Sequence, residues 1–129
     1  LGLEFLTHRK VGPKDAVMFD IDDTLIDTIY QEPIYSSIRL AQVAKQLGYK
    51  VIIITARPNY PDVMEFTISQ LKDIGVPYDE LYLSIKKSDV KQYTGYKYIL
   101  SVGDQWHDTT DSEHFIKLPG VADSLFHMA

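Results

Sequence analysis

The run Val51-Ile52-Ile53-Ile54-Thr55 constrains the fold more than any other stretch of this sequence. It is β-branched throughout and does not alternate with polar residues. A strand with this pattern buries both of its faces, which is typical of parallel sheets covered by helices on each side. The run therefore predicts an α/β fold built on a largely parallel sheet.

The rest of the chain alternates in the way that such a fold requires. Apolar residues at helical spacing separate the hydrophobic runs, with Pro33 and Pro61 placed to open helices and Gly48, Gly75 and Gly95 placed to end them. This alternation indicates βαβ units and a mostly parallel central sheet of about five strands. The expected strands lie at 16–21, 51–55, 80–84, 98–102 and 114–118, and the expected helices at 34–47, 61–74 and 88–93.

Length and composition fit one globular domain. The 129 residues are typical of a single domain, and a hydrophobic content of 45% is sufficient for a core. We therefore expect one domain over 1–129. Residues 1–14 are expected to form a loose lead-in that ends near Gly12-Pro13, and residues 22–33 a loop or small flap.

Charge and cysteine content exclude several classes of function. The formal net charge of −5 argues against extended nucleic-acid binding, although a single nucleotide or a strand end remains compatible with it. The sequence contains no cysteine, which excludes disulfides, thiolate metal sites and thiol nucleophiles. We see no signal peptide and no apolar run long enough to span a bilayer, so we expect a cytoplasmic protein without a membrane partner.

Polar residues follow each expected strand where a parallel sheet would gather them at one edge. Asp20 and Asp22 occupy alternate positions at the end of the first strand, so they can converge on one point. The later strands are followed by a hydroxyl, by cations and by further acids. These residues are Thr55 and Arg57, then Lys86 and Lys87, then Asp104 and Asp108.

This set of side chains suits phosphoryl transfer. A carboxylate can attack phosphorus and form an aspartyl-phosphate, and Mg²⁺ prefers the oxygen ligands that the other acids offer. A hydroxyl and a lysine can hold the phosphate oxygens. Each residue also has an ordinary explanation, such as a strand position for Thr55, a turn for Asp104 or a helix cap for Asp108. Their consecutive placement at strand ends favours the functional interpretation.

The motifs Asp20-Ile-Asp-Asp-Thr24, Thr55, a following lysine, and Gly103-Asp-Gln-Trp-His-Asp108 resemble those of the haloacid dehalogenase-like (HAD) superfamily. Within that superfamily the chain is most similar to the class III (subfamily IIIB-like) acid phosphatase branch. The similarity implies a three-layer, Rossmann-like HAD core. The segments that carry it are Phe19–Leu25, Ile54–Pro58, Gly103–Trp106 and Phe115–Pro119.

The resemblance implies a Mg²⁺-dependent phosphatase in which Asp20 is the nucleophile and Asp22 the general acid/base. Asp22 would turn its side chain to the substrate and offer its backbone carbonyl to the metal. Asp108 would support the metal shell or orient the lysine. The implied catalytic residues are Asp20, Asp22 and Lys87. The implied substrate-binding residues are Thr55, Ala56, Arg57 and Lys87, and the implied metal-binding residues are Asp20, Asp22, Asp104 and Asp108.

Two assignments stay open at the level of sequence. Lys87 precedes Ser88 as the family's lysine does at the start of a helix, which favours it over Lys86 and Lys91. His107 stands where similar sequences carry a smaller polar residue, so it either reaches the substrate or lies at the surface.

The segment between the first motif and the second strand is too short for a cap domain. A site without a cap is open to bulky phosphate ends, or could take a lid from a second copy of the chain in a homo-oligomer. Tyr30, Tyr35 and Tyr60 would then stack on a base or sugar, or else pack in the core. The leading interpretation is hydrolysis of a phosphomonoester. The alternatives are polynucleotide-end (3′-phosphatase-like) processing and a non-catalytic phosphate- or partner-binding protein.

Overall fold

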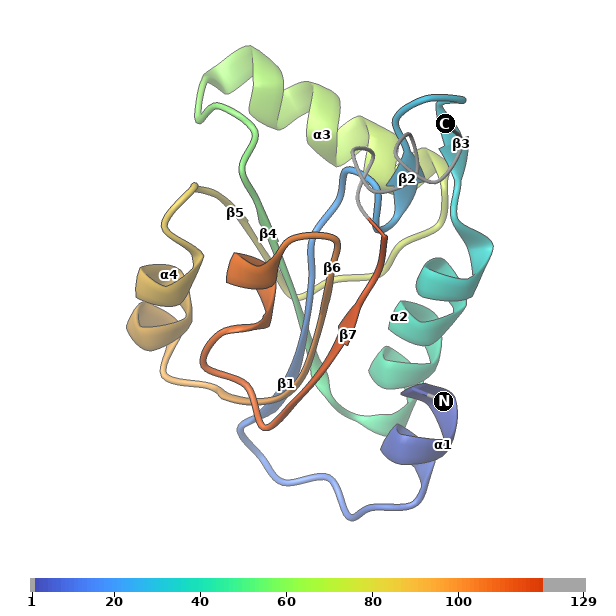
Figure 1. Cartoon of the computed structure of the whole chain (residues 1–129), viewed down its shortest axis with the longest axis vertical. Coiled ribbons are helices and arrows are strands. Elements are labelled where there is room, and N and C mark those ends of the chain that lie inside the picture. The colour runs from blue at the N-terminus through green and yellow to red at the C-terminus, as the bar shows by residue number, and fades with distance from the viewer. Residues whose placement is uncertain (1, 120–129) are drawn as a thin grey trace.

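The computed structural model describes residues 2–119, and at its centre lies a five-stranded parallel sheet in the order β5-β4-β1-β6-β7 (Figure 1). The predicted α/β class and parallel sheet are therefore confirmed. β1 is central, with β4 on one side and β6 on the other, so both of its neighbours contribute to the edge where it ends. The strands are β1 (Asp15–Phe19), β4 (Lys50–Thr55), β5 (Glu80–Leu83), β6 (Lys97–Gly103) and β7 (His114–Lys117).

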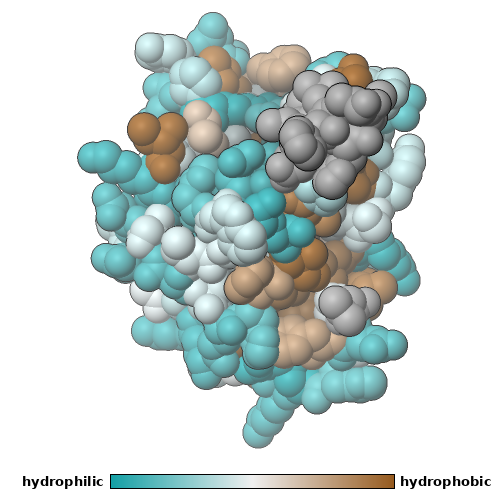
Figure 2. Space-filling model, in the orientation of Figure 1, coloured by the Kyte–Doolittle hydropathy of each residue, from teal (hydrophilic) through white to brown (hydrophobic). Residues whose placement is uncertain are grey.

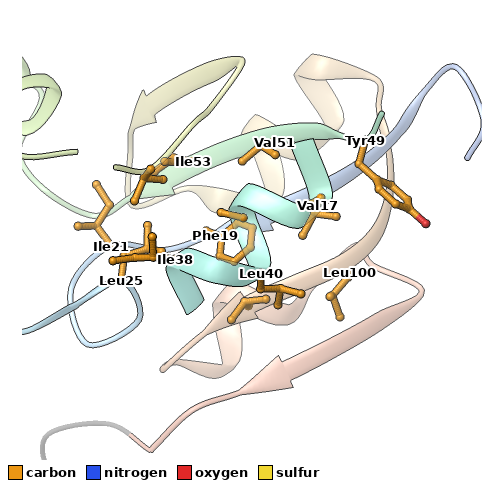
Figure 3. Close-up of a cluster of buried hydrophobic side chains, with 14 of the residues drawn as sticks. Val17, Phe19, Ile21, Leu25, Ile38, Leu40, Tyr49, Val51, Ile53 and Leu100 are labelled. Carbon is orange, nitrogen blue, oxygen red and sulfur yellow. The ribbon is translucent and has the colours of Figure 1, made fainter. Parts of the chain in front are cut away.

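Alternate residues of the central strands enter two separate apolar clusters. Val17 and Phe19 of β1 pack into the larger cluster, together with Val51 and Ile53 of β4 and residues of the helices on that side (Figure 3). The residues between them, such as Met18, enter the smaller cluster on the opposite face. Both faces of β1 and β4 are thus covered, and for β4 this confirms the prediction from the absence of alternation in residues 51–55.

The helices form the outer two layers. Leu6 of α1, Ile38 of α2 and Leu71 of α3 belong to the larger cluster, whereas Val90 of α4 packs against the smaller one. Figure 1 shows α2 and α4 on opposite sides of the sheet. The helices are α1 (Gly2–Thr7), α2 (Tyr35–Leu47), α3 (Pro61–Asp73), α4 (Lys87–Thr94) and the 3₁₀ turn η1 (Trp106–Thr109).

Helix boundaries follow the predicted signals at most ends. Gly48 ends α2 in the left-handed conformation with a φ of 100°, which a residue without a Cβ adopts at low cost. Pro61 occupies the first turn of α3, where its missing N–H would have had no partner in any case. Gly95 ends α4 in the same manner as Gly48 ends α2.

The predicted loose lead-in is wrong, because Gly2–Thr7 form a helix that is packed on the domain. Leu6 is fully buried, and the Tyr49 hydroxyl donates a 2.9 Å hydrogen bond to its carbonyl oxygen. The missing Cβ of Gly2 lets the chain come close to Ile116 and Leu40, because an added Cβ would lie 2.9 Å and 3.0 Å from the ends of these side chains. These contacts order a segment that lacked a clear apolar period.

Pro33 does not open a helix. It belongs to a small hairpin formed by β2 (Ile26–Asp27) and β3 (Glu32–Pro33), in which it pairs with Ile26. The backbone N–H of Ile34 donates a 2.8 Å hydrogen bond to the Leu25 carbonyl, which carries the hairpin one residue further before α2 begins. The predicted flap is thus this hairpin. Within the described residues, neither the hairpin nor the segment that contains α3 forms a cap domain.

The face shown in Figure 2 is largely hydrophilic, with hydrophobic atoms between β7 and α2. A shallow hollow of about 230 Å³ lies in this region, lined by residues that include Leu40, Ile116 and Leu118. No helix within residues 2–119 is both long and apolar enough to cross a membrane.

Candidate active site

The carboxyl end of the sheet carries a cavity of about 300 Å³ formed where three strands that are adjacent in the sheet end. Asp20 directly follows β1, Thr55 ends β4 and Asp104 directly follows β6. The parallel sheet therefore gathers these residues as the sequence predicts. The cavity is lined by Asp20, Asp22, Asp23, Thr55, Ala56, Arg57, Asp104 and Gln105.

Lys87 is the lysine that reaches this edge. Its Nζ lies 2.9 Å from Oδ1 of Asp20 and also donates to Oδ1 of Asp108, and its side chain is only 1% exposed. Lys86, one position earlier, is exposed. Lys91 is buried one turn further along α4, where its Nζ donates to the Asp108 carbonyl of η1 at 2.8 Å and to Ser101 Oγ of β6 at 3.0 Å. Of the three candidates, Lys87 alone contacts the predicted nucleophile.

Asp20, Asp104 and Asp108 form a buried acidic cluster. Each contributes a carboxylate oxygen, and these atoms lie within 4.8 Å of one another. Burial raises the pKa of Asp20 to about 8, because the charge of Lys87 only partly offsets the desolvation and the charge of Asp108 raises the pKa further. The cluster therefore places three acids against one lysine, and this excess of negative charge fits a divalent cation with oxygen ligands.

The Asp22 carboxylate lies outside the acidic cluster. Of the four residues predicted to bind metal, three bring their side chains together, and Asp22 instead pairs with Arg57. This agrees with a side chain that faces the cavity. The contribution of the Asp22 backbone carbonyl to a metal site stays a prediction.

Asp108 is held from two directions. Its Oδ2 accepts a 3.0 Å hydrogen bond from the backbone N–H of Gln105, within the capping box that starts η1. Behind it, Gly103 comes so close that an added Cβ would lie 2.3 Å from the Cβ of Asp108. The sequence shows this glycine only as part of a motif, whereas the structure gives it a steric role.

Arg57 was predicted to bind substrate, and the structure pairs its guanidinium with Asp22. Nε lies 3.0 Å from Oδ2 and Nη2 lies 2.9 Å from Oδ1, while Nη1 donates to Thr67 Oγ1 at 3.0 Å. Thr55 is buried with its hydroxyl 3.3 Å from the Arg57 backbone N–H, and the exposed Ala56 lines the cavity. Sequence reasoning missed Thr67, whose only signal is a hydroxyl within the apolar stripe of α3.

The remaining candidates lie at the surface. The Nε2 atom of His107 is 3.8 Å from Oδ1 of Asp108, and the side chain is half exposed, so it belongs to the rim. Tyr30, Tyr35 and Tyr60 are all at least 63% exposed, which contradicts the core-packing alternative for them. Asp23 takes a turn conformation with φ 61° and accepts hydrogen bonds from Thr28.

Comparison with known families decides the affiliation. The family model described as HAD superfamily, subfamily IIIB (acid phosphatase), matches residues 30–122. The chain belongs to this family. The matched region contains Thr55, Lys87, Asp104 and Asp108 but starts after Asp20 and Asp22. The first motif therefore rests on its own sequence and on its place beside the matched residues in the structure.

Among solved structures, the fold is similar to a chain of the Pnkp1/Rnl/Hen1 complex, with a TM-score of 0.69 and 18% sequence identity. The similarity covers 84% of the present chain and 47% of that chain, so this subfamily IIIB domain spans about half the length of its structural neighbour. At this identity the likeness concerns the fold alone. No curated protein matches the sequence.

Proposed function

We propose that this member of subfamily IIIB is a Mg²⁺-dependent phosphatase that hydrolyses a phosphomonoester through an aspartyl-phosphate on Asp20. The observation that carries the proposal is the buried contact between Asp20 and Lys87 beside two further acids, at an edge open to a 300 Å³ cavity. A nucleophile, a cation for phosphate oxygens and a set of oxygen ligands thus share one site.

The acidic cluster has the donor set that Mg²⁺ requires. Asp20, Asp104 and Asp108 would hold the ion through carboxylate oxygens. When bound, the ion supplies positive charge that neutralises phosphate oxygens and the crowded acids. Burial raises the pKa of Asp20 in the metal-free chain, and a bound cation would favour the ionised form that can attack phosphorus.

In the first step, the Asp20 carboxylate forms a bond to phosphorus while the ester P–O bond breaks. Asp22 gives a proton to the leaving alcohol oxygen. In the second step, Asp22 takes a proton from water, whose oxygen attacks phosphorus and releases inorganic phosphate and the Asp20 carboxylate. Lys87 and Thr55 would stabilise the charge on the phosphate oxygens in both steps.

The proposal is tested by phosphate release from an aryl phosphate, with Mg²⁺ or with a chelator, for the parent chain and for Asp20→Asn. We expect turnover in the parent with Mg²⁺, and none above background in the other arms. Equal activity with the chelator would refute the metal assignment. Unchanged activity of Asp20→Asn would refute the covalent route.

The substrate class is tested by a second screen that compares nucleotides, sugar phosphates and oligonucleotides with terminal phosphates. The exposed tyrosines at 30, 35 and 60 and the absence of a cap in the described residues are compatible with a bulky leaving group. Preferential release from oligonucleotide ends would favour end processing. Correct folding without turnover on any substrate would favour a non-catalytic binding protein.

A further inference from the structure

The contact between Arg57 and Asp22 is a two-point contact. Each Asp22 oxygen accepts one N–H of the guanidinium, at 3.0 Å and 2.9 Å. The Arg57 side chain is 13% exposed, whereas the Asp22 side chain is 42% exposed at the cavity. A bidentate pair of this kind fixes the plane of the carboxylate as well as its position.

The guanidinium is itself held from a third side. Its Nη1 donates to Thr67 Oγ1 at 3.0 Å, and Thr67 is fully buried on α3. Arg57 thus connects α3, which packs on the sheet, to the carboxylate of Asp22. The pair is anchored by the fold rather than by two flexible surface side chains.

Thr67 occupies a position where an apolar residue is expected. The helical spacing of α3 predicts Ile68 on the inner stripe, but Ile68 is 44% exposed and the neighbouring Phe66 is 62% exposed. Because α3 buries Thr67 and leaves Ile68 and Phe66 exposed, the helix loses the stabilisation that burial of these two apolar side chains would provide. The hydrogen bond to Arg57 is the interaction that this orientation makes.

We propose that Arg57 and Thr67 are positioning residues that aim the Asp22 carboxylate at the leaving-group oxygen. In this role Arg57 acts on the reaction through Asp22 rather than as a ligand of the phosphate. Each Asp22 oxygen keeps a lone pair beyond its bond to Arg57, which can carry the proton to be transferred, and Asp22 and Arg57 both line the cavity. The inference rests on the phosphatase activity proposed above and extends it to the control of proton transfer.

The first test uses the leaving group. An alkyl phosphate needs a proton donor, whereas the nitrophenolate of p-nitrophenyl phosphate departs readily without one. We expect Arg57→Ala to lower kcat for the alkyl ester by about 10–100-fold, part of the usual range for general acid catalysis. The second step with the nitrophenyl ester also needs Asp22, so the comparison uses the first step. For this ester we expect the rate of phosphoenzyme formation, and inhibition by inorganic phosphate, to change by less than about threefold, since the phosphate contacts remain. Arg39→Ala, which removes an exposed arginine from α2, is the matched control.

The second test is a double-mutant cycle. In the Asp22→Asn background, Arg57→Ala should have little further effect on the alkyl ester, because both changes remove the same function. Thr67→Val, which keeps the shape but removes the hydroxyl, should shift kcat for the alkyl ester in the same direction by a smaller factor. Thr67→Ser should recover most of that loss, with thermal unfolding as the check that each variant folds.

Two outcomes would overturn the role. One is an equal loss of phosphoenzyme formation from both esters, accompanied by phosphate inhibition weakened about tenfold or more, which would make Arg57 a phosphate ligand. The other is additivity of Arg57→Ala and Asp22→Asn. A folded parent chain without turnover on either ester would instead overturn the proposed function and, with it, this role for Arg57.

Discussion

Asp20 and Asp22 leave the same strand and meet different surroundings. Asp20 is buried, contacts Lys87 and lies among acids that outnumber the local cation. Asp22 is half exposed and is matched by one arginine. The first region carries an excess of negative charge, whereas the second is balanced.

This difference shows how a short motif can yield two roles. In the acidic cluster, the unbalanced charge creates a place for a cation and brings a nucleophile to it. In the Asp22–Arg57 pair, the matched charges fix the orientation of the Asp22 carboxylate, which suits a group that must transfer a proton to a defined atom. Substitutions in each region can therefore separate the two roles by experiment.

The sharpest separation comes from comparing Asp20→Asn with Asp22→Asn. We expect Asp20→Asn to lower turnover of every substrate by at least about 10⁴-fold, because the attacking atom is lost. Asp22→Asn should spare the first step with p-nitrophenyl phosphate and slow the second, so that phosphoenzyme accumulates. Mass spectrometry of rapidly quenched samples measures this adduct.

The corresponding control is the double variant Asp20→Asn/Asp22→Asn, which should form no adduct. Adduct formation by Asp20→Asn alone would assign the nucleophile to another residue and would remove the basis of the comparison.

Metal binding should distinguish the regions without any assay of turnover. Mg²⁺ should raise the free energy of unfolding of the parent chain, by about 2.7 kcal/mol at a hundred times the Kd. Arg57→Ala should keep this gain, because Asp22 lies outside the acidic cluster. Asp104→Asn should lose most of it. Thermal melts with Mg²⁺ titrated against each variant measure the effect, and an equal gain in Asp104→Asn would contradict the assignment.

A glycine pair tests whether the acidic cluster depends on close packing behind it. Gly103→Ala would force a Cβ to within 2.3 Å of Asp108, so we expect loss of about 1–3 kcal/mol of stability and at least a tenfold loss of turnover. Gly95→Ala provides the matched change. Gly95 has a φ of 69° and nothing within 4 Å of an added Cβ. The Gly95→Ala variant should therefore lose about 1–2 kcal/mol of stability from backbone strain alone and keep its turnover.

The fold and the acidic cluster could largely be predicted because both follow from local pattern. Five apolar runs set the strands, and parallel pairing forces their polar ends together. The choice of Lys87 over Lys86 follows from which residue starts α4. These features need only the order of elements along the chain.

The features that sequence could not supply are those set by tertiary contacts. The helix at Gly2–Thr7 depends on packing against Tyr49 and α2. The inward side chain of Thr67, in place of Ile68, is matched by a hydrogen bond from Arg57, which lies in the loop before α3. The role of Gly103 likewise depends on a distance to Asp108 that no motif encodes.

The smallest expected effect comes from another carboxylate, Asp79, which lies outside both regions. It accepts hydrogen bonds from Lys45 and, at 2.8 Å, from the backbone N–H of Val51. Burial tends to raise the pKa of Asp79, but these hydrogen bonds and the charge of Lys45 outweigh it and hold the pKa below its usual value. Asp79→Asn should therefore cost about 1 kcal/mol at pH 7 and leave turnover unchanged.

The stability that the Asp79 charge contributes should depend on pH in a defined direction. Because the pKa of Asp79 is lower in the folded chain than in the unfolded chain, its contribution is complete above the unfolded value of about 3.9 and is lost as pH falls through the folded value. The difference in unfolding free energy between parent and Asp79→Asn should thus narrow below about pH 4, as measured by urea unfolding at pH 7 and near pH 3. A difference that stays constant over this range would show that Asp79 acts through the shape of its hydrogen bonds and not through its charge. Asp79 would then differ from Asp20 and Asp22, whose proposed roles depend on their charge.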